Sequence, residues 1–291
     1  MTSTKYHETV LVSEVIESLL VKKARKYIDA TAGNGGHALE IAQKGGLVLG
    51  IDLDPEMVKI AKARVGDKAK IVQGNFTKID EIARQNDFYP VAGIVFDLGV
   101  TNIHLKDSAR GFSFENPEAE LDMRINPASQ GVKGSDLLNV LREDQLRQMF
   151  EVTLPPGPAK WITGRVLHSR AAKPIKSVGD FLEVCEGLKI GKPGLSEATL
   201  PFLALRIAVN SELDNLKDVL PKAFGLLEKG GRLAVISFHS GEDSIVKEFF
   251  REKITMGEAE GISFKPIRAK EQEIVENRKS RSAKMRVLQK K

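Results

Sequence analysis

The stretch that decides the fold is Tyr27-Ile-Asp-Ala-Thr-Ala-Gly33-Asn-Gly35-Gly36-His37-Ala38, followed about 20 residues after Gly33 by Asp52. It reads as a strand, a glycine-rich turn, a helix and a second strand with a carboxylate at its tip. Glycines let backbone N–H groups approach a ligand and adopt positive φ. A carboxylate at this spacing can accept hydrogen bonds from ribose hydroxyls. We therefore expect an adenosine-containing cofactor to bind here.

The glycine turn fits two classes of cofactor. Its spacing Gly33-x-Gly35-x-x-Ala38 matches the relaxed dinucleotide fingerprint, so a nicotinamide cofactor is one reading. Three other strand ends favour a different one: Asp29, which could meet a cationic amino group, Asn75-Phe76, which could hold an adenine, and Asp97. Together with Asp52 at the end of the second strand, they make four strand ends whose order resembles that of the Rossmann-like S-adenosylmethionine-dependent methyltransferases. We therefore favour S-adenosylmethionine over a nicotinamide.

The composition indicates a cytoplasmic enzyme. The chain has 291 residues, more than one typical domain, with 42% hydrophobic and 29% charged residues. The single cysteine, Cys185, excludes an internal disulfide framework and a cysteine-based zinc site, which points to a reducing compartment. Glu14 and Glu17 interrupt the first apolar run, and no run approaches the roughly 18 to 20 residues of a membrane helix. We expect neither a signal peptide nor a membrane span.

The positive charge is concentrated at the C-terminal end. The whole chain has a net charge of +5, whereas residues 265–291 alone hold ten Lys or Arg and only three Glu. Such a stretch could attract a phosphate backbone. A solvated tail or a charged final strand is the plainer alternative. Beside a methyltransferase core, nucleic acid is the better prediction.

The order of predicted elements divides the chain. Strands alternate with helices up to Leu98, which predicts a parallel sheet with helices on both faces. Beyond residue 100 the alternation stops, and helical stretches (135–150, 160–170, 178–187) are separated by turn-rich spacers such as 155–158. Helices over about 199–216 and 219–227 then lead into an apolar strand at 229–238. We predict an α/β fold with three parts: a discontinuous Rossmann-like methyltransferase core (1–104 and 205–291), an inserted helical domain for substrate recognition (105–204) and a basic C-terminal segment (265–291).

Six further blocks occur in order along the chain. They are Asp97-Leu-Gly-Val-Thr101-Asn102, Arg110-Gly-Phe-Ser-Phe114, Leu121-Asp-Met-Arg124, Ala204-Leu-Arg-Ile-Ala-Val-Asn210-Ser-Glu212, Gly230-Gly-Arg-Leu-Ala-Val-Ile-Ser-Phe-His239-Ser240 and Arg281-Ser-Ala-Lys-Met-Arg286. With the opening His7-Glu-Thr-Val-Leu-Val-Ser-Glu14, they resemble the bacterial small-subunit ribosomal RNA methyltransferase H (MraW) family over nearly the whole chain. The resemblance implies S-adenosylmethionine-dependent methylation of the exocyclic N4 of a cytidine in the decoding region of 16S ribosomal RNA. The implied partner is that RNA or the assembled small subunit.

The resemblance also implies roles for residues of the core. Gly35, Gly36 and His37 would surround the methionine end of the cofactor, Asp52 would hold the ribose and Phe76 would flank the adenine. His104 stands where the family usually has a glutamine that contacts the cofactor. The complete predicted cofactor set is Asp29, Gly33, Asn34, Gly35, Gly36, His37, Asp52, Phe76, Asp97 and His104.

The chemistry of the reaction points to Asp97. The N4 lone pair of cytosine is delocalised into the ring, so hydrogen-bond acceptors at the amine can localise it and favour attack, through positioning and electrostatics rather than covalent catalysis. We assign Asp97, Thr101 and Asn102 to this task. A base in structured RNA must be splayed into the pocket. The candidates for contact with RNA are Arg110, Phe112, Phe114, Arg124, Arg206, Asn210, His239, Arg281, Lys284 and Arg286.

Several of these residues have plainer readings. Asp29 can cap the helix after the glycine turn, Phe76 can belong to the core, and Asp97 can make a structural hydrogen bond. Phe112 and Phe114 are better explained by packing than by base stacking. His37, His239, Asp52 and Asp97 could converge near strand ends, but no pair of them has metal-ligand spacing such as His-x-x-x-His, so we expect no metal.

The chain departs from the family pattern on the insertion side. The differences lie at 101–104, 154–158 and 196–203, whereas the cofactor end is nearly intact. Two alternatives therefore stay open. One is a divergent methyltransferase acting on another RNA or DNA amino group, and the other is a non-catalytic RNA-binding assembly factor.

Overall fold

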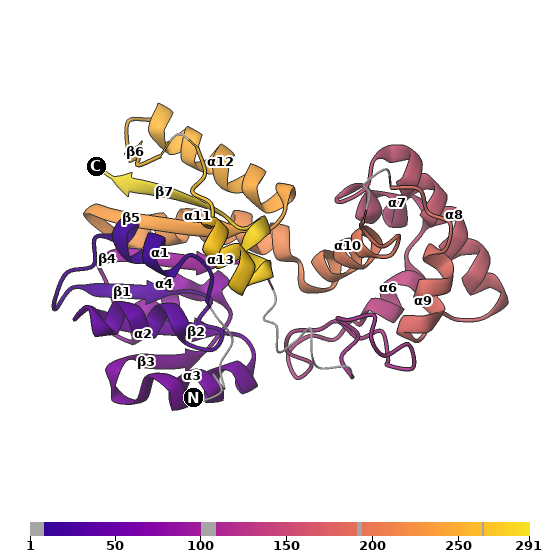
Figure 1. Ribbon diagram of the computed structural model, residues 1–291, viewed down its shortest axis with the longest axis horizontal. Coiled ribbons are helices and arrows are strands. Elements are labelled where there is room, and N and C mark those ends of the chain that lie inside the picture. Colours follow the sequence, from indigo (N-terminus) through magenta and orange to yellow (C-terminus); the bar gives the residue numbers. More distant parts are fainter. Residues whose placement is uncertain (1–8, 100–108, 191–193, 264) are drawn as a thin grey trace. The chain divides into compact units, whose positions relative to one another are not determined.

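A computed structural model describes residues 9–99, 109–190, 194–263 and 265–291 (Figure 1). The chain forms two compact units, here called the core unit (1–99 and 213–291) and the insertion unit (100–212). The predicted site residues Thr101, Asn102 and His104 lie outside the described residues.

The core unit is built on a seven-stranded sheet. Its order is β3-β2-β1-β4-β5-β7-β6, which can be followed from bottom to top in Figure 1. The first five strands of this order are parallel, and β7 is antiparallel to both of its neighbours. The order reverses between β1 and β4, and ligands of open α/β sheets bind where the strand order reverses. The strands are β1 (Lys26–Asp29), β2 (Leu47–Asp52), β3 (Lys70–Gln73), β4 (Val91–Asp97), β5 (Leu227–Ser237), β6 (Ala259–Gly261) and β7 (Lys284–Lys290).

Two hydrophobic clusters cover the two faces of this sheet. One contains apolar residues of α1 (Val12–Leu19), α2 (Gly36–Gln43) and α3 (Pro55–Val65). The other contains those of α4 (Ile79–Gln85), α11 (Glu212–Leu226) and α12 (Ser240–Thr255). β1, β2 and β4 contribute to both clusters, because successive side chains of a strand point to opposite faces. The predicted parallel sheet with helices on both faces is therefore confirmed.

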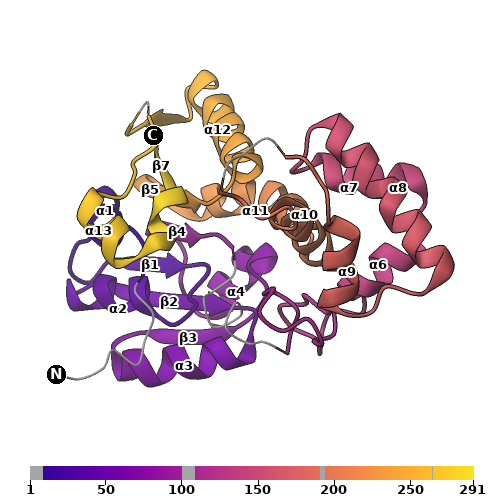
Figure 2. The same ribbon diagram turned by 45° about the vertical axis from the view of Figure 1, so that its right-hand side comes forward.

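The C-terminal segment returns to the sheet. α13 (Glu271–Glu276) lies beside α1 in both views (Figures 1 and 2), where Glu273 Oε1 accepts the Leu11 N–H at 2.8 Å. The short 3₁₀ helix η3 (Arg278–Ser282) follows, and β7 then pairs with β5 from Lys284 onward. Residues 284–290 thus form the charged final strand that was the plainer alternative for this region.

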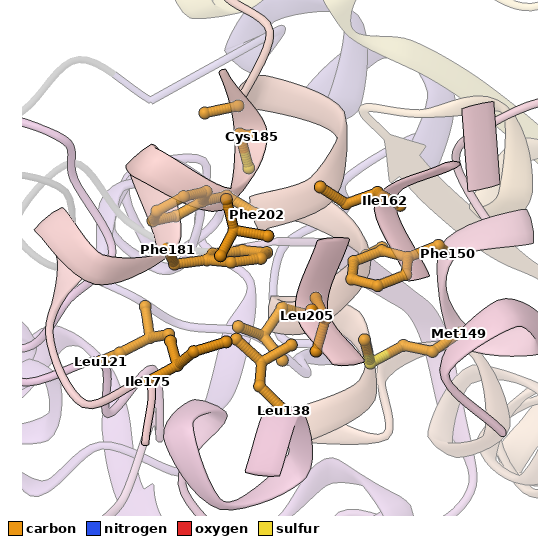
Figure 3. Close-up of a cluster of buried hydrophobic side chains, with 14 of the residues drawn as sticks. Leu121, Leu138, Met149, Phe150, Ile162, Ile175, Phe181, Cys185, Phe202 and Leu205 are labelled. Atoms are coloured by element: carbon orange, nitrogen blue, oxygen red, sulfur yellow. The ribbon is translucent and has the colours of Figure 1, made fainter. Parts of the chain in front are cut away.

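The insertion unit is helical. It contains α6 (Gly134–Val140), α7 (Glu143–Glu151), α8 (Pro156–Ala172), α9 (Val178–Cys185) and α10 (Thr199–Asn210). Their apolar faces enclose a cluster of buried side chains, in which the Phe181 ring lies between Phe150 and Phe202 at centroid distances of 6.4 and 4.7 Å (Figure 3). Ser177 caps the start of α9, because its hydroxyl accepts the Asp180 N–H while the Asp180 carboxylate accepts the Ser177 N–H.

Several helix boundaries differ from the prediction. The predicted helix 135–150 is divided into α6 and α7, because Leu141 and Arg142 have extended backbone conformations with ψ of 140° and 165°. Pro155-Pro-Gly-Pro158 is not a spacer alone: α8 begins at Pro156, because proline suits the first turn of a helix, where its missing N–H has no partner to lose. The predicted helix 199–216 is interrupted at Ser211, whose φ of 49° ends α10. α11 starts at the next residue and continues through Pro221.

None of the helices in the described part of the chain is long and apolar enough to cross a membrane.

We predict that Phe181→Ala destabilises the insertion unit by about 3 to 5 kcal/mol, because it removes a fully buried ring from a cluster that cannot collapse around the gap. Urea unfolding followed by the fluorescence of Trp161, the sole tryptophan and a residue of α8, would report on this unit. Val140→Ala, at a side chain 78% exposed on α6, is the matched control. Equal unfolding midpoints for the two variants would contradict the prediction.

Candidate cofactor and active site

Asp52 joins the second strand to the glycine turn. Its Oδ2 accepts the Gly33 N–H at 2.7 Å, and its Oδ1 accepts the Asp54 N–H at 2.9 Å. The turn itself needs glycine, since Gly33 has a φ of 50° and Gly35 a φ of 82°. A Cβ at Gly35 would also lie 3.0 Å from the Val65 side chain of α3. The carboxylate and the turn are therefore held together where β1 and β2 end.

Asp29, at the end of β1, is fully buried. Its oxygens accept the Ala38 N–H at 3.1 Å and the Thr31 N–H at 3.4 Å. Ala38 belongs to the first turn of α2, where N–H groups have no partner within the helix. This geometry favours the helix-capping alternative for Asp29 over direct contact with a cofactor. Burial raises the pKa of Asp29 to about 6, with nearby Asp97 and Asp52 acting in the same direction and His37 against it.

His37 and Asp97 meet at the reversal point of the sheet. The imidazole is 3% exposed, and its Nε2 lies 3.7 Å from Asp97 Oδ2. Burial lowers the pKa of His37, but attraction by Asp97 and Asp29 outweighs this, so the pKa is raised overall. Three buried atoms of this pair have no hydrogen-bond partner within the described part of the chain. They are both ring nitrogens of His37 and Oδ1 of Asp97. Buried polar atoms are normally paired, so these atoms suit a polar ligand.

Thr31 is a site residue that the sequence analysis missed. Its hydroxyl oxygen accepts the Asp97 N–H at 2.6 Å and so joins the ends of β1 and β4. The position of Thr31 in the sequence could have indicated a role in the site, since this residue lies between Asp29 and Gly33 at a strand end. The residue's role became visible only once β4 was known to lie beside β1.

Phe76 makes a packing contact and is not fully buried, and its contact with the cofactor stays a prediction. The ring packs edge-on against Phe96 with centroids 6.0 Å apart, and the side chain is only partly buried. Asn75 Oδ1 accepts the Thr77 N–H at 3.0 Å and so begins the 3₁₀ turn η2 (Phe76–Lys78) directly after β3. Phe76 follows β3 at the edge of the sheet where β2 ends with Asp52.

A pocket lies next to the end of the glycine turn. Asn34 Oδ1 accepts a hydrogen bond from Arg64 of α3 at 2.7 Å. Beside Gly36 and Arg64 lies a pocket of about 400 Å³, which Thr9, Glu273 and further side chains of α1, α2 and α13 also line. Thr9 packs directly on Gly36, where a Cβ would lie 1.7 Å from its hydroxyl oxygen. The pocket therefore borders the first turn of α2.

The reversal point, the glycine turn and the polar strand ends together define a class I S-adenosylmethionine-dependent methyltransferase. The chain belongs to the MraW methylase family, whose sequence model matches residues 4–291. The predicted fold class, family and cofactor are confirmed.

The relatives cover most of the chain. The Ribosomal RNA small subunit methyltransferase H of Methylacidiphilum infernorum is 40% identical over 259 residues, which is 88% of this chain and 82% of that protein. The protein of the same name from Coprothermobacter proteolyticus is 37% identical over 294 residues, covering 100% of this chain and 98% of its own. Among solved structures, an rRNA methylase from Streptococcus thermophilus aligns with 98% of this chain and 99% of its own at 11% identity and a TM-score of 0.44, a likeness too weak to add to the argument.

The residues of the core unit fit S-adenosylmethionine. Gly33–Gly36, Asp52, Phe76 and Asp97 follow or end β1 to β4 at one edge of the sheet. The unpaired atoms of His37 and Asp97 lie at the same edge and could meet the charged groups of the cofactor. When bound, the cofactor supplies a methyl group activated by a sulfonium. The individual contacts remain predictions.

The arginines predicted to contact RNA in the insertion unit are engaged within that unit. Arg110 Nη2 donates to the carbonyl oxygens of Arg124 and Ile125. Arg124 forms an ion pair with Asp122 at 2.6 Å, which helps to lower the pKa of Asp122 against the effect of its burial. Arg206 pairs in the same way with Glu212 at 2.8 Å. Their role in RNA binding stays a prediction, but the contacts seen here stabilise the insertion unit.

Asn210, Phe112 and Phe114 pack in the same unit. Asn210 is buried, accepts the Ile125 N–H at 3.1 Å and donates to the Met123 carbonyl oxygen at 2.9 Å. Phe112 is 7% exposed, and Phe114 meets Phe202 edge-on at 4.7 Å. These contacts agree with packing, which the sequence analysis favoured for the two aromatic rings.

The basic residues of the C-terminal segment divide into two groups. Lys284 and Arg286 of β7 both bind Asp243 of α12, at 3.2 and 2.7 Å. Arg278 and Arg281 on η3 are exposed. Of the predicted RNA contacts in this segment, Arg281 is thus the one whose side chain faces solvent.

His239 lies between β5 and α12, directly before the first residue of that helix. Its Nδ1 lies 3.5 Å from the Glu242 N–H, and the buried Glu242 carboxylate accepts the Phe238 N–H at 2.8 Å. Its observed contacts are those of a helix cap.

We predict that Asp29→Asn changes the pH dependence of stability. Because the pKa of Asp29 is raised from 3.8 to about 6 in the fold, its contribution is fully present below about pH 4 and is lost as the pH rises through 6. The free energy of unfolding of the wild type minus that of the variant should fall by about 3 kcal/mol between pH 4 and pH 7. Urea unfolding of both proteins across this range measures it, and a constant difference would refute the assignment.

We predict that Asp52→Asn weakens the binding of S-adenosylhomocysteine by about 1 to 3 kcal/mol, since a charge-assisted acceptor is lost. Calorimetric titration measures the affinity, with Asp67→Asn, at an exposed aspartate of η1 (Gly66–Lys68), as the control. A 2′-deoxyribose analogue separates ribose binding from a disturbed turn, because the loss should shrink with that analogue only if Asp52 holds the ribose. Equal losses with both ligands would assign Asp52 to the turn alone.

Proposed function

We propose that this protein transfers the methyl group of S-adenosylmethionine to the exocyclic N4 of a cytidine in small-subunit ribosomal RNA. The curated relatives named above carry the name Ribosomal RNA small subunit methyltransferase H over most of this chain. The single observation that carries the proposal is Asp97. Its Oδ1 has no partner among the described residues, at the end of β4 and beside the glycine turn.

Besides its predicted contact with the cofactor, Asp97 would act on the amine. A carboxylate oxygen accepts a hydrogen bond from the N4 amine, which localises the nitrogen lone pair toward the methyl group. The nitrogen gains a bond to carbon as the carbon–sulfur bond breaks, and it then loses a proton, for which Asp97 is the nearest acceptor proposed. Thr31 holds the backbone of Asp97, and His37 lies 3.7 Å from its carboxylate. Catalysis would thus rest on positioning and electrostatics.

We further propose that the enzyme works in the cytoplasm, on ribosomal RNA or on the assembled small subunit. The single buried cysteine, Cys185, supports a reducing compartment. We propose that the core unit (1–99 and 213–291) binds the cofactor and that the insertion unit (100–212) recognises RNA, which shifts the boundaries predicted from the sequence (1–104 and 205–291 against 105–204) by five residues at one end and eight at the other.

The proposal is tested by methyl transfer from labelled S-adenosylmethionine to naked 16S transcript and to small subunits from cells that lack this gene. Nucleoside mass spectrometry should find N4-methylcytidine, and Asp97→Asn should reduce its formation by at least tenfold while the affinity for S-adenosylhomocysteine changes less. A methylated nucleoside other than cytidine would favour a divergent methyltransferase. Tight RNA binding without methyl transfer to either substrate would favour an assembly factor.

We predict that Arg281→Glu weakens RNA binding, whereas truncation after Asn277 unfolds the core unit because it deletes β7. Each lost phosphate contact should reduce the slope of log affinity against log salt by about 0.7 to 0.9. Filter binding at several salt concentrations measures both quantities. Lys62→Glu, at an exposed lysine of α3, controls for net charge. An unchanged affinity and an unchanged salt slope for Arg281→Glu would show that Arg281 of η3 does not contact the RNA.

A further inference from the structure

One side of helix α8 exposes an aromatic side chain between cations. Lys160, Trp161, Gly164, Arg165 and His168 are all exposed and recur at helical spacing, and we call them the α8 outer face. The opposite side of the helix is buried in the cluster of the insertion unit, to which Ile162 belongs (Figure 3). Packing of the insertion unit therefore accounts for one side of α8 and leaves the outer face to solvent.

The Trp161 side chain is partly exposed to solvent instead of being buried in the hydrophobic cluster of the insertion unit. The side chain is 40% exposed, although it is the sole tryptophan of the chain. The Arg165 guanidinium lies 5.6 Å from the centre of its ring. Arg165 in turn donates to the carbonyl oxygens of Glu183 at 2.9 Å and Val184 at 3.4 Å, both on α9. The arginine and the indole thus form a pair fixed against the neighbouring helix.

The charge around this pair is positive. Between Glu151 and Asp180 the sequence has five Lys or Arg and no carboxylate. Within the described residues, Lys160 and Arg165 have no carboxylate within ion-pair distance, and the contacts of Arg165 are to neutral carbonyl groups. The other three cations are Arg170, which donates to the Leu138 and Leu141 carbonyl oxygens, Lys173, which pairs with Asp180 at 3.0 Å, and the exposed Lys176.

Acidic residues also lie on and beside α9, but none of those that the structure describes forms an ion pair with Lys160 or Arg165. Glu183 and Glu118 act on Lys173, near the C-terminal end of α8. Glu197 accepts the Gly187 N–H at 2.9 Å, close to one edge of the indole. The exposed indole therefore lies beside two cations, Lys160 and Arg165, that have no ion-pair partner among the described residues.

We propose that the α8 outer face binds a single-stranded segment of the substrate RNA, with one unstacked base on Trp161 and phosphates at Lys160 and Arg165. Aromatic rings beside cations are the usual platform for unpaired bases, because every base has a flat face and every phosphate a negative charge. At Gly164 a Cβ would meet no atom within 4 Å, so the backbone of the RNA can approach the helix there. This inference rests on the proposed function and adds to it a second RNA contact, apart from the core unit.

Trp161 is its own reporter, because no other tryptophan contributes to the fluorescence. A short RNA oligonucleotide without secondary structure, titrated into the full chain, should quench the Trp161 emission saturably, and the midpoint should move to higher RNA concentration with added salt. Emission that instead shifts when the protein alone is concentrated, and does not respond to the RNA, would assign the face to a second copy of the chain and overturn the proposal.

Matched variants test the base and phosphate contacts separately. Trp161→Ala should weaken the binding of the oligonucleotide by roughly 5- to 100-fold, whereas Trp161→Phe should retain most of it. Val140→Ala, which removes an exposed side chain from α6, should have no effect. Lys160→Glu should weaken binding and flatten its salt dependence more than Lys229→Glu, at an exposed lysine of the core unit. Equal affinities for Trp161→Ala and Val140→Ala would overturn the proposal.

A parallel methyl-transfer assay separates this proposal from the function on which it rests. If the wild type methylates the small-subunit RNA, Trp161→Ala should raise the KM for that RNA with little change in kcat. Normal methylation with an unaltered KM in Trp161→Ala would refute RNA binding by the α8 outer face, but it would not contradict the proposed function. Quenching by RNA without any methyl transfer would support the face while the proposed function failed.

Discussion

The arrangement of the core site depends on one buried carboxylate. Asp29 lies out of water at the end of β1 and accepts the N–H groups of Thr31 and Ala38. These hydrogen bonds fix the path of the chain from the strand through the glycine turn into α2. The cost of burying the carboxylate is visible in its raised pKa, and the N–H groups at the positive end of α2 offset part of it. With α2 held in this way, His37 is placed beside Asp97.

Many of the basic side chains predicted to contact RNA form hydrogen bonds or ion pairs within the protein. Arg110, Arg124 and Arg206 hold carbonyl and carboxylate groups of the insertion unit, and Lys284 and Arg286 fasten β7 to α12. An arginine presents five N–H donors in a fixed plane, so one side chain can hold several loop carbonyls at once. A basic composition is therefore a poor guide to the RNA surface. Exposed cations, such as Arg281 on η3 and Lys160 on α8, are better candidates for contact with RNA.

Local patterns predicted much of the core unit and less of the insertion unit. The glycine turn, Asp52 and the strand ends at Asn75 and Asp97 lie where the sequence places them, because each depends on a few neighbouring residues. The start of α8 was placed four residues late, since the prolines were read as a spacer. The break at Ser211 was missed because hydrophobic periodicity runs through it. A helix end of this kind is set by the backbone conformation of one residue, to which periodicity is insensitive.

The sequence by itself determined the class of fold, the family and the cofactor, because a glycine turn and acidic strand ends are short-range features that the chemistry of the ligand requires. Only the tertiary structure decided how individual side chains are used. It buried Asp29 and paired Arg286 with Asp243, and it left Trp161 in solvent beside Arg165. These outcomes depend on residues far apart in the chain that packing brings together, so neither spacing nor composition could specify them.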